Sequence, residues 1–124
     1  MNILIVEDNS DVSHVLTITF RRADHTAITV ISGEAAIETL KQDVQIDGLI
    51  TDVNLAGKMN GIELAKHARA IKPNLPICIM SGLPLEEIRR KFGNTPFDHF
   101  VSKPFERTVF NPFFALIARA NPKT

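Results

Sequence analysis

The chain has 124 residues, enough for one domain with a sizeable core, and the sequence predicts a single domain over residues 1–124. Lysine plus arginine and aspartate plus glutamate number 14 each, so the net charge gives no indication of a nucleic-acid or membrane partner. No apolar run approaches the roughly 18 residues of a membrane span, and the lone Cys78, which excludes an internal disulfide, fits a cytoplasmic protein.

Short apolar runs alternate with amphipathic stretches along the chain. The apolar runs predict strands at residues 2–6, 27–31, 48–51, 75–80 and 99–101. The amphipathic stretches predict helices that begin at Asn9 or Ser10, cover 33–42 and 61–71, run from Pro84 to Gly93, and end near Ala120. In the first helix the expected inward face carries Val12, Val15, Leu16 and Thr19. Cys78 lies inside an apolar run, which favours a core residue over a nucleophile.

Five strands alternating with five helices predict an α/β fold, a doubly wound parallel sheet with helices on both faces. In such sheets ligands bind at the carboxyl ends of the strands. Polar residues follow four of the predicted strands, namely Glu7 and Asp8, Asp52, Ser81 and Lys103. We therefore expect these five side chains to converge on one edge of the sheet.

Three carboxylates at one point, from Glu7, Asp8 and Asp52, repel each other unless a cation lies among them. Hard oxygen ligands in small number suit Mg²⁺, which keeps several waters and commonly binds phosphate oxygens as well. The Lys103 ammonium and the Ser81 hydroxyl suit a transferred phosphoryl group, because one offsets its charge and the other donates a hydrogen bond. The pattern predicts a Mg²⁺-dependent phosphoryl site.

The same residues lie in motifs that resemble those of the response-regulator receiver domain of two-component signalling, the CheY-like superfamily. The motifs are Glu7-Asp8, "TDVNL" around Asp52, "MSG" around Ser81 and "VSKPF" around Lys103. The resemblance covers essentially the whole chain and implies a flavodoxin-like fold with strand order 2-1-3-4-5. It also implies a signalling phosphoacceptor rather than an enzyme, since a receiver catalyses only its own phosphorylation and dephosphorylation.

The resemblance implies a role for each acidic residue. Asp52 is then the phosphoacceptor, and Asp8 is a direct Mg²⁺ ligand. Glu7 binds the metal mainly through water, and the backbone carbonyl of Asn54 completes the protein ligands. Asn54 also bears on an enzyme alternative, a phosphatase passing through an aspartyl-phosphate, because that family needs an aspartate at this position.

The resemblance further implies a phosphorylation switch. Ser81 and Lys103 contact the phosphoryl group, and Phe100, three residues before Lys103, is the aromatic switch residue. A histidine kinase or histidine phosphotransfer protein is the expected donor. The fourth helix, fifth strand and fifth helix then present an altered face to a downstream protein or a second copy. A degenerate receiver that acts by contact without phosphorylation is the alternative, disfavoured because no site residue is missing.

Two departures from the family pattern lie after the acceptor. Ala56 stands where a proline is usual, and Gly61 lies nine residues after Asp52 rather than eight, so "NLAGKMNG" carries one extra residue. Many receivers with this longer loop are stand-alone or attached to hybrid kinases. We expect the loop to be mobile in the absence of phosphate and metal. The four histidines have no ligand-like partner at i+3 or i+4, which favours surface or strand-edge roles for His14, His25, His67 and His99.

Pro112 lies inside the stretch where a regular fifth helix is expected. A proline in a helix interior costs about 3 kcal/mol, whereas one at the first turn costs little. We therefore expect Asn111 to be the N-cap and residues 106–110 to form a separate turn. The inward stripe of that helix reads Phe113, Leu116, Ile117 and Ala120, which leaves Phe114 outward. Two hypotheses follow: the phenylalanines pack beneath the irregular turn, or Phe110 or Phe114 joins an apolar patch for a dimer or partner.

Overall fold

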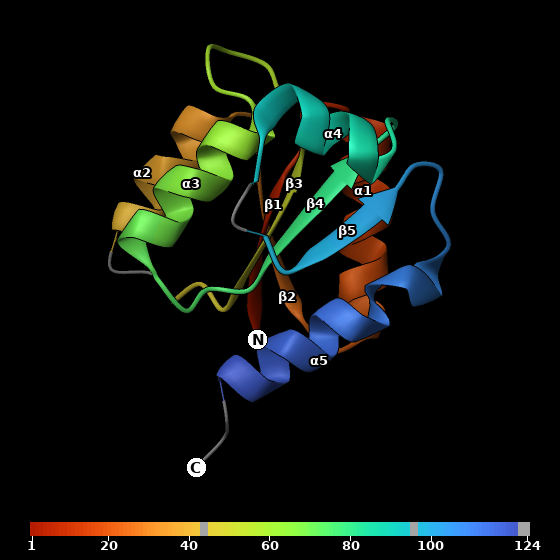
Figure 1. Ribbon diagram of the computed structural model, residues 1–124. Helices are drawn as coiled ribbons and strands as arrows, with labels where there is room; N and C mark the ends of the chain where they lie inside the picture. Colours follow the sequence, from red (N-terminus) through yellow and green to blue (C-terminus); the bar gives the residue numbers. More distant parts are fainter. Residues whose placement is uncertain (43–44, 95–96, 122–124) are drawn as a thin grey trace.

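The computed structural model describes residues 1–42, 45–94 and 97–121, so residues 122–124 of the predicted domain lie outside the described part. Its centre is a five-stranded parallel sheet in the order β2-β1-β3-β4-β5, as predicted (Figure 1). The strands are β1 (Asn2–Val6), β2 (Thr26–Val30), β3 (Gly48–Asp52), β4 (Ile77–Ser81) and β5 (His99–Ser102). The helices are α1 (Ser10–Arg22), α2 (Gly33–Lys41), α3 (Gly61–Ile71), α4 (Leu85–Phe92), the 3₁₀ turn η1 (Arg107–Phe110) and α5 (Asn111–Ala120).

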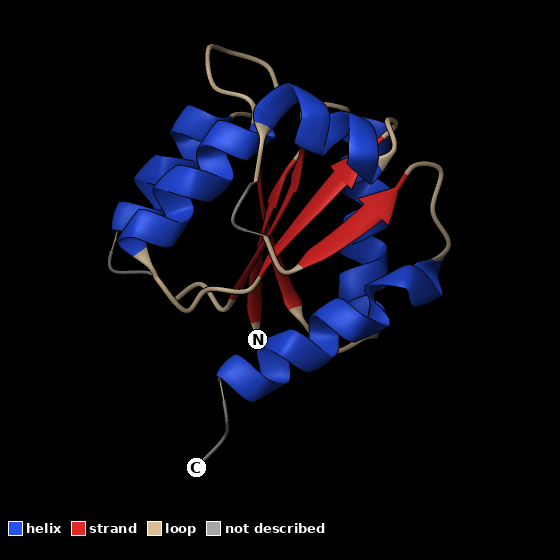
Figure 2. Cartoon of the chain, in the orientation of Figure 1, coloured by secondary structure: helices blue, strands red, loops and turns tan. Residues whose placement is uncertain are grey.

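The helices cover both faces of the sheet, which makes the fold the doubly wound flavodoxin-like arrangement (Figure 2). Helices α2, α3 and α4 close one face over a core that includes Leu4, Leu49 and Ile79. Helices α1 and α5 close the other over a core that includes Ile5 and Ile50. Burial on both faces explains why the central strands are continuous apolar runs rather than alternating ones. None of the described helices is long and apolar enough to cross a membrane.

Three strands, β3, β4 and β5, extend one residue further at their carboxyl ends than predicted. Asp52 is the last residue of β3 and pairs in register with Met80, and Ser81 is the last residue of β4 and pairs with Ser102. Their side chains are therefore held by strand geometry rather than by loops. Cys78 is buried in β4, where desolvation raises the pKa of its thiol well above the ordinary range, so its predicted core role is confirmed.

Helix α1 begins where predicted, because the Asn9 side chain accepts hydrogen bonds from the backbone N–H groups of Asp11 and Val12. The predicted inward face is partly wrong. Val15 is 49% exposed, and Phe20, which we did not assign to the core, is fully buried. The buried stripe is rotated toward Phe20 because this ring packs edge-to-face against Phe110 with centroids 5.3 Å apart.

The irregular C-terminal segment follows the proline argument. The 3₁₀ turn η1 precedes α5, and Pro112 lies in the first turn of α5, as predicted. Asn111 is the first helical residue rather than the N-cap, because the chain enters α5 directly from η1 with Phe110 already in a helical conformation.

The prediction that Phe114 points outward is wrong. Its ring packs 5.3 Å from that of Phe20 and 4.8 Å from that of His25, and Phe110 is fully buried. The phenylalanines of the C-terminal segment, Phe105, Phe110, Phe113 and Phe114, therefore pack together beneath the turn. Phe110 and Phe114 belong to this core rather than to an outward-facing patch for a partner. The histidine prediction holds for His14 and His67, which are exposed.

Candidate functional site

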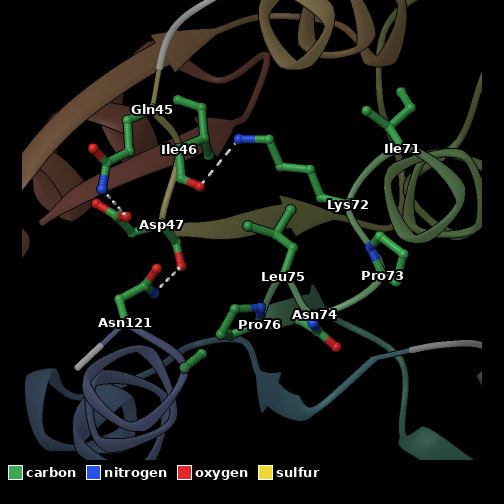
Figure 3. Close-up of a pocket in the computed structure, with 11 residues that line it drawn as sticks. Gln45, Ile46, Asp47, Ile71, Lys72, Pro73, Asn74, Leu75, Pro76 and Asn121 are labelled. Carbon is green, nitrogen blue, oxygen red and sulfur yellow. Dashed lines mark hydrogen bonds between the residues drawn. The ribbon is translucent and has the colours of Figure 1, made fainter.

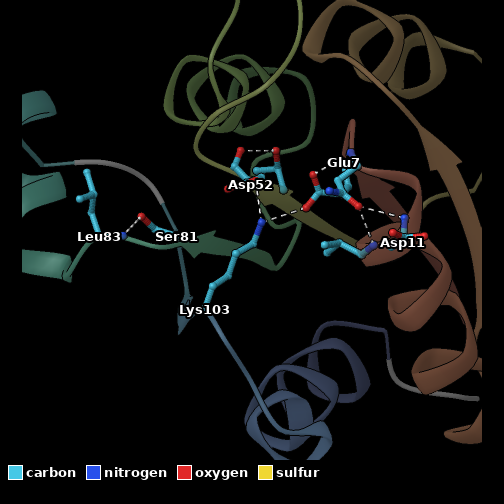
Figure 4. A network of polar contacts seen from close by, with 9 residues as sticks. Glu7, Asp11, Asp52, Ser81, Leu83 and Lys103 are labelled. Atoms are coloured by element: carbon cyan, nitrogen blue, oxygen red, sulfur yellow. Dashed lines mark hydrogen bonds and ion pairs between the residues drawn. The ribbon is translucent and has the colours of Figure 1, made fainter.

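Three charged side chains meet at the carboxyl edge of the sheet (Figure 4). The Lys103 ammonium lies 2.7 Å from Oδ2 of Asp52 and 3.1 Å from Oε1 of Glu7, so it bridges the two carboxylates. The exposed fractions of the side chains are 1% for Glu7, 13% for Asp52 and 25% for Lys103. The Asp52 carboxylate is thus reachable from solvent, whereas that of Glu7 is not.

Burial raises the pKa of Glu7, and hydrogen bonds from the Asn9 N–H and from Lys103 only partly oppose the effect. Burial acts to lower the pKa of Lys103, but its hydrogen bonds to Asp52 and Glu7 outweigh burial and raise it. The Lys103 ammonium therefore pairs with two carboxylates in a poorly hydrated part of the molecule. The site consequently has an excess of negative charge.

Ser81 is buried next to this cluster at the end of β4. Its backbone carbonyl accepts a hydrogen bond of 2.8 Å from the N–H of Lys103, which joins the ends of β4 and β5. Its Oγ accepts a hydrogen bond of 2.9 Å from the N–H of Leu83, so the hydroxyl hydrogen remains for another acceptor (Figure 4).

The remaining predicted residues lie around this core of the site. Asp8 and Asn54 are exposed in the segments that follow β1 and β3, and Phe100 is half-buried in β5 against the α2–α4 side. Within the described residues, no three His, Cys, Asp or Glu side chains are grouped so as to hold a metal. The structure thus joins two of the three predicted carboxylates through Lys103, while the exposed Asp8 keeps its hydration.

Gly61 supports the site through a contact that its spacing from Asp52 in the sequence did not predict. A Cβ at Gly61 would lie 2.0 Å from the backbone oxygen of Asp52, far inside contact distance, and the Gly61 N–H donates to the carbonyl of Val53 at 2.8 Å. The α3 N-terminus, capped by Asn60 and Glu63, thereby lies directly against the Asp52 backbone. A glycine opening a capped helix close after a strand-end aspartate is the signal that could have revealed this contact.

A hollow of about 450 Å³ lies at the opposite, amino-terminal end of the sheet (Figure 3). Its buried carboxylate, Asp47, accepts hydrogen bonds from the Asn2 N–H at 2.7 Å and the Gln45 side chain at 2.9 Å. Asn121 donates to the Asp47 carbonyl at 3.2 Å. These hydrogen bonds connect residues near both ends of the chain to the residue that precedes β3, so the Asp47 carboxylate has a structural role.

The family model of the response regulator receiver domain matches residues 3–111. The chain belongs to this family. It is thus a receiver domain of two-component signalling, with the CheY-like fold described above. No similar sequence was found among curated proteins.

Solved structures agree with this assignment. A response regulator receiver protein from Sinorhizobium medicae is 29% identical, with 98% of this chain and 97% of that chain covered and a TM-score of 0.86. A putative response regulator from Chloroflexus aurantiacus is 28% identical, with coverage of 95% and 98% and a TM-score of 0.82. The chemotaxis protein CheY4 of Vibrio cholerae, 21% identical with coverage of 94% and 97%, shares the fold with a TM-score of 0.81.

The raised pKa of Glu7 makes a prediction about the stability of this receiver. Its contribution to the free energy of unfolding is fully present below the ordinary value of 4.5 and is lost as the pH rises through the raised pKa. At pH 7 without divalent ions, Glu7→Gln should therefore increase the free energy of unfolding by about 1 kcal/mol. The difference should vanish toward pH 4. Urea titrations of both proteins across this range measure it, and a less stable variant at pH 7 would show that the Lys103 ion pair outweighs desolvation.

Proposed function

We propose that this receiver accepts a phosphoryl group on Asp52 from a phosphohistidine of a histidine kinase or phosphotransfer protein. The supporting observation is a partly exposed Asp52 carboxylate at the end of β3 with the Lys103 ammonium 2.7 Å away. The chain then acts as a signalling phosphoacceptor and catalyses only its own phosphorylation and dephosphorylation.

In this reaction an Asp52 oxygen attacks the phosphorus in line, an acyl phosphate O–P bond forms, and the bond from phosphorus to the donor nitrogen breaks. The proton that neutralises the leaving imidazole comes from the donor side. Lys103 exchanges its contact with the Asp52 carboxylate for one with a phosphoryl oxygen, so its charge stays paired as the charge moves outward.

The residues present fit a magnesium ion. Glu7 and Asp52 offer oxygen ligands with one ammonium between them, and Mg²⁺ needs only one or two carboxylates together with water and phosphate oxygens. Asp8 and the Asn54 carbonyl would complete the ligands from the two neighbouring segments. When bound, the ion would reduce the negative charge on the phosphoryl oxygens.

The phosphorylated state is read out through Ser81 and Phe100. The Ser81 hydroxyl turns toward the phosphoryl group, and Phe100 rotates into the space that this movement vacates. Phe100 lies in β5 beside α4, where its ring is 6.3 Å from that of Phe97. The α4-β5-α5 face then changes shape for a downstream protein or a second copy, which needs only a few kcal/mol of difference between pre-existing states.

An apolar hollow beside Lys103 suits the docking of the donor protein. It measures about 500 Å³ and is lined by Val12, Val15, Pro104 and Phe105 together with Asp11 and Lys103. Since Lys103 lines this hollow and its ammonium contacts Asp52, a helix with apolar side chains that rests here brings its phosphohistidine toward Asp52.

Purified protein incubated with Mg²⁺ and phosphoramidate should gain the mass of one phosphoryl group. The gain should be lost when EDTA is added, because the ion reduces the charge repulsion between donor and acceptor. A protein that stays unmodified under these conditions while it binds a histidine kinase would instead be a degenerate receiver.

Val15→Lys should slow phosphoryl transfer from a phosphohistidine protein by about tenfold or more, since a charge placed in an apolar contact costs over 1.4 kcal/mol. Labelling by phosphoramidate should not change, because this small donor needs no docking surface. Ala70→Lys adds the same charge at an exposed position on α3 and is the matched control. Equal slowing by both substitutions would contradict docking on α1.

A further inference from the structure

The loop between β3 and α3, residues 54–60, packs against the start of α2. Ser32, the N-cap of α2, pairs with Ala56 in an isolated parallel bridge. The backbone N–H of Lys58 donates a hydrogen bond of 3.2 Å to Oε2 of Glu34, in the first turn of α2. The loop with one extra residue, which we predicted to be mobile, is therefore attached at its middle to another element.

Two glycines show how closely the loop and α2 approach. Gly57 has a φ of +89°, a conformation that other residues rarely adopt, and a Cβ there would lie 2.8 Å from Oε2 of Glu34. A Cβ at Gly33 would lie 2.9 Å from the sulfur of Met59. The backbone at Gly57 thus lies directly against the Glu34 carboxylate.

The loop is also held where it meets the phosphoacceptor. The Thr51 hydroxyl donates a hydrogen bond of 2.9 Å to the backbone oxygen of Asp52, the same atom that Gly61 approaches. The loop is consequently restrained at its α3 end by Gly61, which lies against the Asp52 oxygen and donates to the Val53 carbonyl, and at its middle by Glu34. Asn54, whose carbonyl is the proposed cation ligand, lies between Val53 and the segment held by Glu34.

We propose that Glu34 is a positioning residue for cation binding, an inference that rests on the proposed function. By accepting the Lys58 N–H, its carboxylate reduces the number of conformations of the loop. Ordering the Asn54 carbonyl toward an ion at Asp52 then costs less conformational entropy. Glu34 does not touch the ion, so it acts on affinity and leaves the chemistry of Asp52 unchanged.

Two measurements on the whole chain test this role: Mg²⁺ affinity by calorimetry and amide hydrogen exchange of Lys58 by NMR. Glu34→Ala should weaken Mg²⁺ binding by about threefold to tenfold, the equivalent of one hydrogen bond. It should also speed exchange at Lys58. Glu34→Gln should largely restore both, because an amide oxygen accepts the same bond. Glu38→Ala, an exposed position on the same helix, should change neither.

Unaltered Mg²⁺ affinity in Glu34→Ala, when the wild type binds the ion, would overturn the inference and leave the proposed function intact. Equal weakening by Glu38→Ala would also overturn it, since the effect would then be one of general surface charge. A wild type that binds no Mg²⁺ would overturn the proposed function, and this inference with it.

Discussion

Asp52→Asn should abolish the gain of a phosphoryl group from phosphoramidate. The amide is a far weaker nucleophile than the carboxylate, and it forms no stable acyl phosphate. It is almost the same size, so the β3 pairing and the contact with Gly61 should persist. Mass spectrometry of wild type and variant after equal incubation measures the effect, and we expect the signal to fall below detection.

Asp11→Asn is the matched control for this experiment, because it removes a nearby exposed carboxylate in α1 and leaves Asp52 unchanged. It should be labelled like the wild type. Label that persists in Asp52→Asn would place the acceptor elsewhere, and the assignment of Asp52 would be wrong.

Phe110→Ala should decrease the free energy of unfolding by about 3–5 kcal/mol, the cost of emptying a fully buried phenylalanine site. The ring lies 5.3 Å from that of Phe20 and 5.1 Å from that of Phe105, so its removal leaves a cavity between α1 and η1. Phe114→Ala should decrease the free energy of unfolding by clearly less, because the Phe114 ring is only half-buried. Urea unfolding of the three proteins measures both values.

The same two variants, Phe110→Ala and Phe114→Ala, distinguish core packing from a role on the α4-β5-α5 face. If Phe110 acted in a partner or dimer contact, Phe110→Ala would leave the unfolding midpoint nearly unchanged and would alter sedimentation instead. A small loss of stability would therefore contradict the packing described above.

Local chemistry made much of this fold predictable. The alternation of apolar runs and amphipathic stretches predicted five parallel strands, whereas their order was implied only by the resemblance to the receiver family. Pro112 predicted the break before α5, because the missing N–H is tolerated only in the first turn. Asn9 predicted the start of α1 from its side-chain oxygen alone.

The site was predictable only as a set of residues near one edge. Strand-end positions brought Glu7, Asp52, Ser81 and Lys103 to one end of the sheet. Periodicity does not determine, however, which of these side chains form ion pairs with each other. The structure places the Lys103 ammonium between Glu7 and Asp52, whereas Asp8 remains exposed. Burial determines which carboxylates pair with Lys103, because the ammonium lies against the two carboxylates that have lost most of their hydration.

By itself, the sequence determined the kinds of element, their approximate ends and the types of reactive side chain, because these follow from interactions between residues close along the chain. Only the tertiary structure decided that Phe20 rather than Val15 faces the core and that Phe114 turns inward. It also decided that Gly61 lies against Asp52. The physical reason is that each of these depends on a surface formed by residues distant in the sequence, and one helix turn carries no information about what will cover it.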